Sequence, residues 1–267
     1  MPDITPYRVY ACRYGAREAT RREHFIDPDP RPDVSMPMDY FVWVATNDDR
    51  TIVIDTGYSA EVGTRRGRTH LRQPADALRL IGIDAEHVED VVLTHFHYDH
   101  VGTVRDFPRA HFHANAADMQ YVTGREMHDP RERGPYEIDD VSNLVRLLHE
   151  ERLTLYDAPA ELAPGLSIHH LGGHTPGIQP VRVWTQRGWV VLASDVSHYY
   201  ENMESGRPFP ITHDRKKAVA AFSALRALAD SPQHIVPGHD PRVLERYPAP
   251  LLNLEGIVAR LDVPPSH

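Results

Sequence analysis

Residues 95–100 read His-Phe-His-Tyr-Asp-His, which places three imidazoles and one carboxylate within a single short segment. Imidazole and carboxylate groups are ligands of zinc and other borderline divalent metals. One short turn cannot direct all four groups to a single small ion without strain, so two metal ions are the natural interpretation. A merely histidine-rich surface loop is the alternative, and it is disfavoured because further candidate ligands follow downstream.

These downstream candidates each lie in a loop just after a short apolar run, which is how a rigid sheet delivers ligands to one point. They are His174 after 166–168, Asp195 after 189–193 and His239 after 234–236. Each is a weak signal alone, because a lone histidine in a Gly-rich turn is usually a surface residue. As an ordered set, they support a metal centre.

The elements that must position these residues can also be predicted from the sequence. The run 91–94 directly before the hexapeptide is apolar and β-branched, and it predicts a buried strand. Residues 40–44 and 51–54 flank a polar turn and predict a hairpin. The other expected strands are 166–170, 181–184, 189–193 and 234–236, and the expected helices are 74–82, 115–122, 138–150 and 215–229. The patterns alone predict a mixed α/β fold.

Together these motifs resemble the metallo-β-lactamase superfamily, in its dinuclear hydrolase branch. The resemblance runs from Asp55-Thr56-Gly57 to Pro237-Gly238-His239. It implies a four-layer αββα sandwich formed by one domain over residues 1–267. It also implies that Asp55 orients the metal ligands. By the same match, His95, His97 and His174 hold the first of two zinc ions, Asp99, His100 and His239 hold the second, and Asp195 bridges them.

The composition limits the class of partner. The chain has 267 residues and a formal net charge of −9, so it lacks the basic footprint of a nucleic-acid-binding protein. We see no signal peptide and no apolar stretch of about 20 residues, the length needed to cross a membrane. The single cysteine, Cys12, excludes an intramolecular disulfide and suits a reducing cytoplasm. We therefore expect a cytoplasmic protein with a small-molecule substrate. The sequence leaves open whether it forms a homodimer.

Two metals held close together lower the pKa of a shared water, which favours hydrolysis by a bridging hydroxide. Within the superfamily, redox members carry Glu where this chain has His97. β-Lactamases carry Cys or Ser where this chain has Asp195. Glyoxalase II enzymes have a helical domain after the last ligand, whereas here only residues 240–267 follow.

The closest resemblance is to the N-acyl-homoserine-lactone lactonases, which are quorum-quenching enzymes. They carry a Tyr three residues after the bridging Asp, where it assists the substrate carbonyl. Here His198 stands at that position, followed by Tyr199. Either His198 takes the role as a neutral imidazole donor, or Tyr199 reaches in from the next position, or the substrate differs. We expect Asp99 to act as both ligand and general acid. Because His198 replaces this Tyr, the resemblance supports an N-acyl-homoserine lactone as substrate less well than it supports a lactone in general.

Three functional hypotheses follow. The first is a dinuclear-zinc hydrolase that opens an N-acyl-homoserine lactone or a related cyclic ester. The second is another hydrolase of the same fold, acting on a thioester, a phosphodiester or a cyclic amide. The third is a metal-binding protein without turnover, which is disfavoured because every expected ligand position is filled. The ligand types do not choose between zinc, iron, cobalt and manganese.

Two irregular segments, 15–38 and 121–137, are expected to face the substrate or to be solvated connections. Their apolar members suit an acyl or ring group, which predicts a preference for hydrophobic lactones. Most of their arginines are expected to be solvated. The apolar members are Phe25, Met36, Met38, Tyr121, Met127 and Tyr136.

Overall fold

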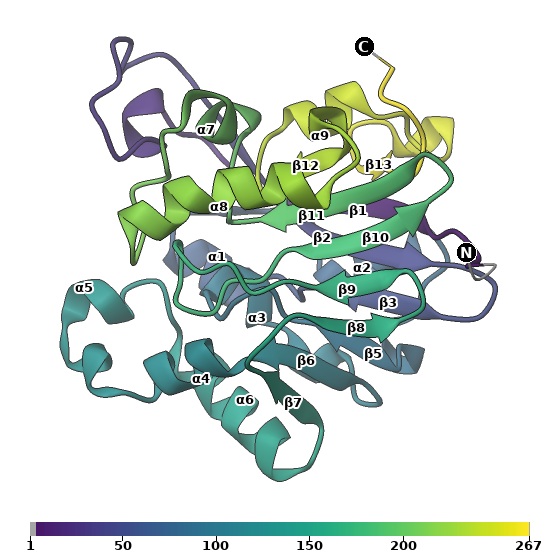
Figure 1. The fold of residues 1–267 in the computed structure, drawn as a ribbon. Helices are drawn as coiled ribbons and strands as arrows, with labels where there is room; N and C mark the ends of the chain where they lie inside the picture. Colours follow the sequence, from purple (N-terminus) through teal and green to yellow (C-terminus); the bar gives the residue numbers. More distant parts are fainter. Residues whose placement is uncertain (1–3, 267) are drawn as a thin grey trace.

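The computed structural model describes residues 4–266 and contains two β-sheets stacked face to face with helices on both outer sides (Figure 1). The first sheet has the strand order β13-β1-β2-β3-β5-β6-β7, with β4 added beside β1. Its strands are β1 (Arg8–Arg17), β2 (Met38–Thr46), β3 (Thr51–Ile54), β4 (Thr69–His70), β5 (Asp90–Val92), β6 (His111–Asn115), β7 (Leu153–Tyr156) and β13 (Val258–Arg260).

The second sheet has the strand order β12-β11-β10-β9-β8. Its strands are β8 (Ala160–Ala163), β9 (Leu166–Ile168), β10 (Val181–Thr185), β11 (Gly188–Ser194) and β12 (Ile235–Pro237). The pairs β3–β5 and β11–β12 are parallel, so the carboxyl ends of neighbouring strands meet at one edge in each sheet. The expected α/β four-layer sandwich is confirmed.

The helices surround the sheets. The α-helices are α1 (Ala60–Arg65), α2 (Pro74–Arg79), α3 (Tyr98–Val101), α4 (Ala116–Val122), α5 (Pro130–Arg133), α6 (Ile138–His149), α7 (Tyr200–Ser205), α8 (Arg215–Leu228) and α9 (Arg242–Arg246). Short 3-10 helices are η1 (Arg21–Glu23), η2 (Ala85–His87), η3 (Val104–Asp106), η4 (Arg125–His128), η5 (Pro232–His234) and η6 (Leu252–Leu254). Within residues 4–266, no helix has the length and apolar character that a membrane crossing requires.

Strand β2 shows how the layers are held together. All of its residues are buried, and alternate side chains point to opposite faces of the sheet. Val42 and Val44 pack in one core with Leu78 of α2 and Leu144 of α6. The intervening side chains, which include Trp43, pack in a second core together with strands of the other sheet and with α8. A strand that is buried on both faces has a continuous apolar sequence, as residues 40–45 of β2 do.

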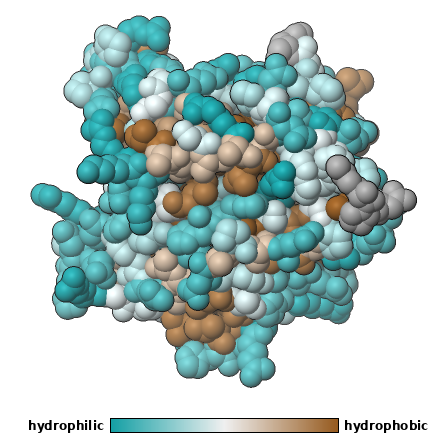
Figure 2. Space-filling view, viewed as in Figure 1, coloured by the Kyte–Doolittle hydropathy of each residue, from teal (hydrophilic) through white to brown (hydrophobic). Residues whose placement is uncertain are grey.

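The face shown in Figure 2 is mostly hydrophilic, with hydrophobic side chains in separate patches. The two segments expected to be irregular contain more regular structure than the sequence suggested. Strand β1 continues to Arg17, an isolated bridge joins Thr20 to Ser35, and η4 and α5 lie within 121–137. Short helices and strand pairings give the backbone N–H and C=O groups of these segments hydrogen-bond partners. The proline-rich composition does not predict these short elements.

Candidate metal centre

The first sheet delivers the hexapeptide to the carboxyl end of β5. His95 lies in the loop that follows this strand, and His97 caps the amino end of the short helix α3. Asp99 and His100 fall in the first turn of α3, and both side chains are buried. The strand-to-helix turn therefore places all four polar side chains of the hexapeptide close together.

The second sheet supplies the remaining three side chains. Asp195 directly follows β11 and His239 follows the parallel neighbour β12, so the two residues leave the same edge of the sheet. His174 lies in the loop between β9 and β10. Ser194 has a φ of 47°, in the left-handed region that non-glycine residues rarely adopt, and this turn directs the chain into Asp195.

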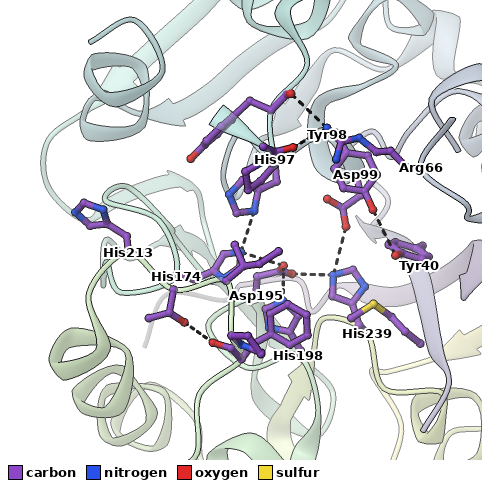
Figure 3. A pocket seen from close by; sticks show the side chains of 18 of the residues that line it. Tyr40, Arg66, His97, Tyr98, Asp99, His174, Asp195, His198, His213 and His239 are labelled. Atoms are coloured by element: carbon purple, nitrogen blue, oxygen red, sulfur yellow. Dashed lines mark hydrogen bonds and ion pairs between the residues drawn. The ribbon is translucent and has the colours of Figure 1, made fainter. Parts of the chain in front are cut away.

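The structure brings all seven predicted ligand residues together into two adjoining groups. Within each group, one possible ligand atom per residue lies within 4.8 Å of the others. The first group is His95, His97, His174 and Asp195, and the second is Asp99, His100 and His239. Figure 3 shows several of these side chains converging around Asp195.

Asp195 lies between the two groups and turns one carboxylate oxygen toward each. Its Oδ2 is 3.3 Å from His174 Nε2 and 3.8 Å from His95 Nε2. Its Oδ1 is 2.9 Å from His239 Nε2 and 3.4 Å from His100 Nε2. This is the arrangement that a bridging carboxylate requires.

The donor atoms fit divalent metal ions. His95 Nε2 and His100 Nε2 are buried and have no hydrogen-bond partner within residues 4–266, although buried polar groups are normally paired. Burial, with smaller contributions from neighbouring imidazoles, holds the pKa of His95 and His97 well below the usual value. His95 combines a neutral imidazole with an unpaired nitrogen, which suits it to coordinate a cation. Burial opposes protonation of His100, but the surrounding carboxylates of Asp195, Asp55 and Asp99 raise its pKa, and the same carboxylates would attract a metal ion.

Hydrogen bonds on the far side of the imidazoles fix their orientation. His100 Nδ1 lies 2.7 Å from Asp55 Oδ2, and His239 Nδ1 lies 2.8 Å from the backbone oxygen of Asp39. The other Asp55 oxygen accepts the backbone N–H of Thr94 at 2.7 Å. Asp55 follows β3 with a φ of 62°. The carboxylate therefore does what the sequence resemblance implied, contacting a ligand imidazole from behind.

His198 lies beside the first group and is among the residues that line the pocket. Its Nε2 is 3.0 Å from Asp195 Oδ2, and its Nδ1 is buried without a partner in the described chain. The ring stacks on Phe209 with centroids 3.7 Å apart. Burial lowers the pKa of His198 to about 3, so the ring is neutral near pH 7 and has one proton to donate. That proton is well placed for Asp195, which differs from the expected contact with a substrate carbonyl.

Tyr199 faces away from the metal centre. Its hydroxyl donates to the backbone oxygen of Pro37 at 3.1 Å and lies 3.0 Å from His24 Nε2. The residue is not among those that line the pocket. The structure thus does not bring Tyr199 into position for the catalytic role that sequence proximity suggested. The reason is that Tyr199 caps the amino end of α7, where the chain turns away from the site.

The two metal-ligand groups lie at a cavity of about 430 Å³, within the range of small-molecule sites. Of the apolar side chains expected to contact substrate, Met38, Tyr121 and Tyr136 line it, whereas Phe25, Met36 and Met127 do not. The sequence analysis missed other lining residues, because their position at the cavity depends on contacts between distant segments. Among them are Arg17 and Tyr40 in strands β1 and β2, and Arg66, Arg68, Phe209 and Ile211 outside the helices and strands.

Residues outside the pocket complete the comparison. Most arginines of the two irregular segments were expected to be solvated, but Arg21 is buried and forms ion pairs with Asp29 and Glu201 at 2.8 and 2.5 Å. His111 and His113, which are two residues apart, lie on one face of β6. His113 contacts Asp90 and Tyr156 on neighbouring strands, so this pair supports the sheet.

The chain belongs to the metallo-β-lactamase superfamily, whose family model matches residues 36–239. It is 25% identical to a probable metallo-hydrolase of Mycobacterium tuberculosis, over 76% of this chain and 72% of that protein. It is 27% identical to the N-acyl homoserine lactonase AiiB of Agrobacterium fabrum, over 72% of this chain and 76% of that protein. The solved structure of AidC, a dizinc quorum-quenching lactonase with bound product, superimposes with a TM-score of 0.70 at 18% identity, covering 90% of this chain and 92% of that one.

Proposed function

We propose that the protein is a dinuclear-zinc hydrolase that opens a lactone ring, either an N-acyl-homoserine lactone or a related cyclic ester. The observation that carries this proposal is Asp195, which turns one oxygen toward each of two groups of buried side chains with possible ligand atoms. The lactonase relatives and the dizinc lactonase with the same fold support the choice of substrate class and metal.

In this proposal His95, His97 and His174 would hold the first zinc, Asp99, His100 and His239 would hold the second, and Asp195 would be shared by both. When bound, two zinc ions supply a hydroxide near neutral pH and polarise the ester carbonyl. The buried setting of the ligands excludes bulk water from one side of the substrate, which strengthens electrostatic interactions there. The open side is the cavity, where the ring binds.

Asp99 is the residue that we propose to move a proton. It lines the cavity, and its Oδ2 lies 3.8 Å from His239 Nε2 and 3.7 Å from His100 Nε2. Addition of hydroxide to the carbonyl and cleavage of the ring C–O bond leave a carboxylic acid and an alkoxide on the same molecule. A carboxylate at the cavity wall beside the second metal-ligand group is placed to take the proton of the acid and pass it to the alkoxide.

His198 acts through another residue in this proposal. Its neutral ring donates Nε2–H to Asp195 Oδ2, and Phe209 holds the ring in place by stacking. Groups that hydrogen-bond to metal ligands fix the ligand geometry and tune its basicity. His198 is therefore a positioning residue for Asp195, where the sequence had suggested direct contact with the carbonyl.

A panel of substrates assayed with the zinc-loaded enzyme tests this function. Release of acid, followed by pH-stat, is expected with lactones and weaker or absent with thioesters, phosphodiesters and cyclic amides. The same panel run after zinc removal should show no turnover, and restoring zinc should recover it. Turnover of a thioester or phosphodiester in preference to every lactone would refute the lactonase assignment but retain a hydrolase.

A further inference from the structure

The cavity wall carries more positive charge than hydrolysis of a neutral lactone needs. Four arginines line it. Arg17 forms an ion pair with Glu23, and Arg66 is paired with Glu137 at 2.7 Å. The other two, Arg68 and Arg131, have no carboxylate within 4.0 Å in the described part of the chain, residues 4–266. Arg68 is partly buried, whereas Arg131 is exposed at the mouth.

Arg68 is held in place by neutral partners. Its Nε donates to the hydroxyl of Tyr98 at 3.0 Å, and its Nη1 donates to the backbone oxygen of Arg66 at 2.9 Å. Its Nη2 makes no hydrogen bond within residues 4–266. The guanidinium therefore keeps free N–H groups, and it keeps a charge that the protein does not neutralise. Arg68 therefore offers free N–H groups and an unpaired charge to an anionic ligand in the cavity.

A short chain of side chains joins Arg68 to the proposed second metal. The Tyr98 hydroxyl lies 3.4 Å from the Tyr40 hydroxyl, and the Tyr40 ring lies edge-on to His239 with centroids 5.1 Å apart. Figure 3 shows Tyr98, Tyr40 and His239 along the same side of the pocket. A substrate whose ester lies at the metal-ligand groups can therefore reach Arg68 with a substituent of modest length.

Three carboxylates also line the cavity, and none forms an ion pair with Arg68. Asp99 and Asp195 belong to the metal-ligand groups, and Glu132 accepts the hydroxyl of Tyr121 while keeping its charge, so it offsets one of the two unpaired arginines. If the proposed function holds, the positive charge of two divalent ions exceeds the negative charge of Asp99 and Asp195. A cationic cavity concentrates anionic ligands and repels cationic ones.

We propose, on the basis of the lactonase function above, that the substrate carries a carboxylate and that Arg68 binds it. Arginine presents a planar fork of donors that matches a carboxylate, and such charge-assisted bonds are among the strongest in proteins. Apolar side chains also line the cavity, among them Met38, Phe209 and Ile211. The substrate class is thus a lactone with an apolar portion and a carboxylate-bearing arm, which revises the expectation of a purely hydrophobic lactone.

Matched pairs of lactones test this inference. One member carries a carboxylate on a short alkyl arm, and the other carries the isosteric primary amide. For the zinc-loaded wild type, kcat/KM for the acid should exceed that for the amide by about tenfold to a hundredfold, the range for a charge-assisted hydrogen bond. In Arg68→Gln this preference should fall toward unity, because the rate on the acid should fall by much more than the rate on the amide. Arg68→Lys should keep part of the preference.

A control variant removes the same charge elsewhere. Arg109 is exposed and does not line the cavity, so Arg109→Gln should leave the acid-to-amide preference unchanged. A purely structural role for Arg68 would lower the rate on acid and amide alike. Equal rates on acid and amide in the wild type, or a preference that persists in Arg68→Gln, would overturn the inference.

A binding measurement separates this inference from the proposed function. The corresponding lactams, as acid and amide, are titrated calorimetrically into the zinc-loaded protein, where ring opening is not needed. The acid lactam should bind about tenfold or more tightly than the amide, and this difference should disappear in Arg68→Gln. If no lactone is hydrolysed but the lactams behave in this way, the lactonase function fails and carboxylate binding by Arg68 stands. Equal lactam binding refutes the Arg68 inference even if lactones are hydrolysed.

Discussion

Asp55 contacts His100 from behind the metal centre, with 2.7 Å between Asp55 Oδ2 and His100 Nδ1. Both side chains are buried, so water does not compete for this hydrogen bond. The contact directs the opposite ring nitrogen, Nε2, toward Asp195. The orientation of one proposed ligand is thus set by a residue that itself touches no metal.

The variant Asp55→Asn should weaken metal binding by about tenfold to a hundredfold, the usual effect of losing such a supporting carboxylate. Competition with a chromogenic chelator measures the change. The matched control is Asp90→Asn, because Asp90 makes a similar contact with His113 at 3.0 Å but lies away from the site. Wild-type zinc affinity in Asp55→Asn would show that the orientation of His100 does not depend on this carboxylate.

The purified protein should bind about two zinc ions per chain when fully loaded, because its ligands form two groups. Elemental analysis after dialysis gives the ratio. His113→Ala should leave that ratio unchanged, since His113 contacts only neighbouring strands. One ion or fewer per chain in the loaded wild type would be incompatible with a dinuclear centre.

Asp99→Asn should lower kcat for lactone opening by about a hundredfold or more, the scale of lost general-acid help. Steady-state kinetics are measured at saturating zinc, with metal content determined in parallel. A variant that binds less zinc but regains near-normal turnover in excess zinc would mean that Asp99 serves only as a ligand.

His198 and Tyr199 are neighbours in sequence but should respond differently to mutation. His198→Phe removes the donor to Asp195 and should lower turnover or zinc affinity by about tenfold to a hundredfold, whereas His198→Gln should retain much of both. Tyr199→Phe should leave turnover within about twofold and cost about 1 kcal/mol of unfolding free energy, because only structural hydrogen bonds are lost. Thermal denaturation and kinetics on the three variants distinguish these outcomes. A large kinetic defect in Tyr199→Phe would restore that hydroxyl as a catalytic candidate.

Asp140, in the first turn of α6, should make stability depend on pH. Burial, with Glu137 and Asp139 nearby, raises its pKa to about 7. The unfolded chain releases this proton near pH 4, so the free energy of unfolding falls as the pH rises from about 4 to about 7. Asp140→Asn removes this loss and should be more stable than wild type by about 1–3 kcal/mol at pH 8, with the advantage fading toward pH 4.

Denaturant titrations at several pH values measure that difference. Asp139→Asn, at the exposed neighbouring position, is the control and should show no such trend. A stability difference between Asp140→Asn and wild type that stays constant from pH 4 to pH 8 would contradict the assignment.

The proposed ligands could be found from the sequence because they follow strands. A run such as 91–94 predicts both a buried strand and the place where it ends, and the hexapeptide begins there. The helices beginning at Pro74, Ala116, Ile138 and Arg215 were also predicted, with ends that differ by up to a few residues. Local apolar periodicity determines these elements, so one sequence suffices to locate them.

The cavity wall could not be predicted in the same way. Arg66 and Arg68 lie in the turn between α1 and β4, and nothing in their local sequence indicates that this turn packs beside Tyr98. The direction of Tyr199 was also hidden, because it depends on the docking of segment 21–37 against α7. Contacts between segments far apart in the chain decide these side chains, and periodicity carries no information about them.

Thr94 joins the two halves of the molecule, because its hydroxyl donates to Asp55 at 2.8 Å and lies 2.8 Å from the hydroxyl of Ser194. The proposed ligands straddle this junction, four on the first sheet and three on the second. Zinc bound there would act as a reversible cross-link between positions as distant as 95 and 239, restricting the unfolded chain much as a disulfide does. Stability would then rise with the concentration of free zinc. For a chain whose one cysteine cannot form an internal disulfide, zinc supply would set the lifetime of the fold as well as its activity.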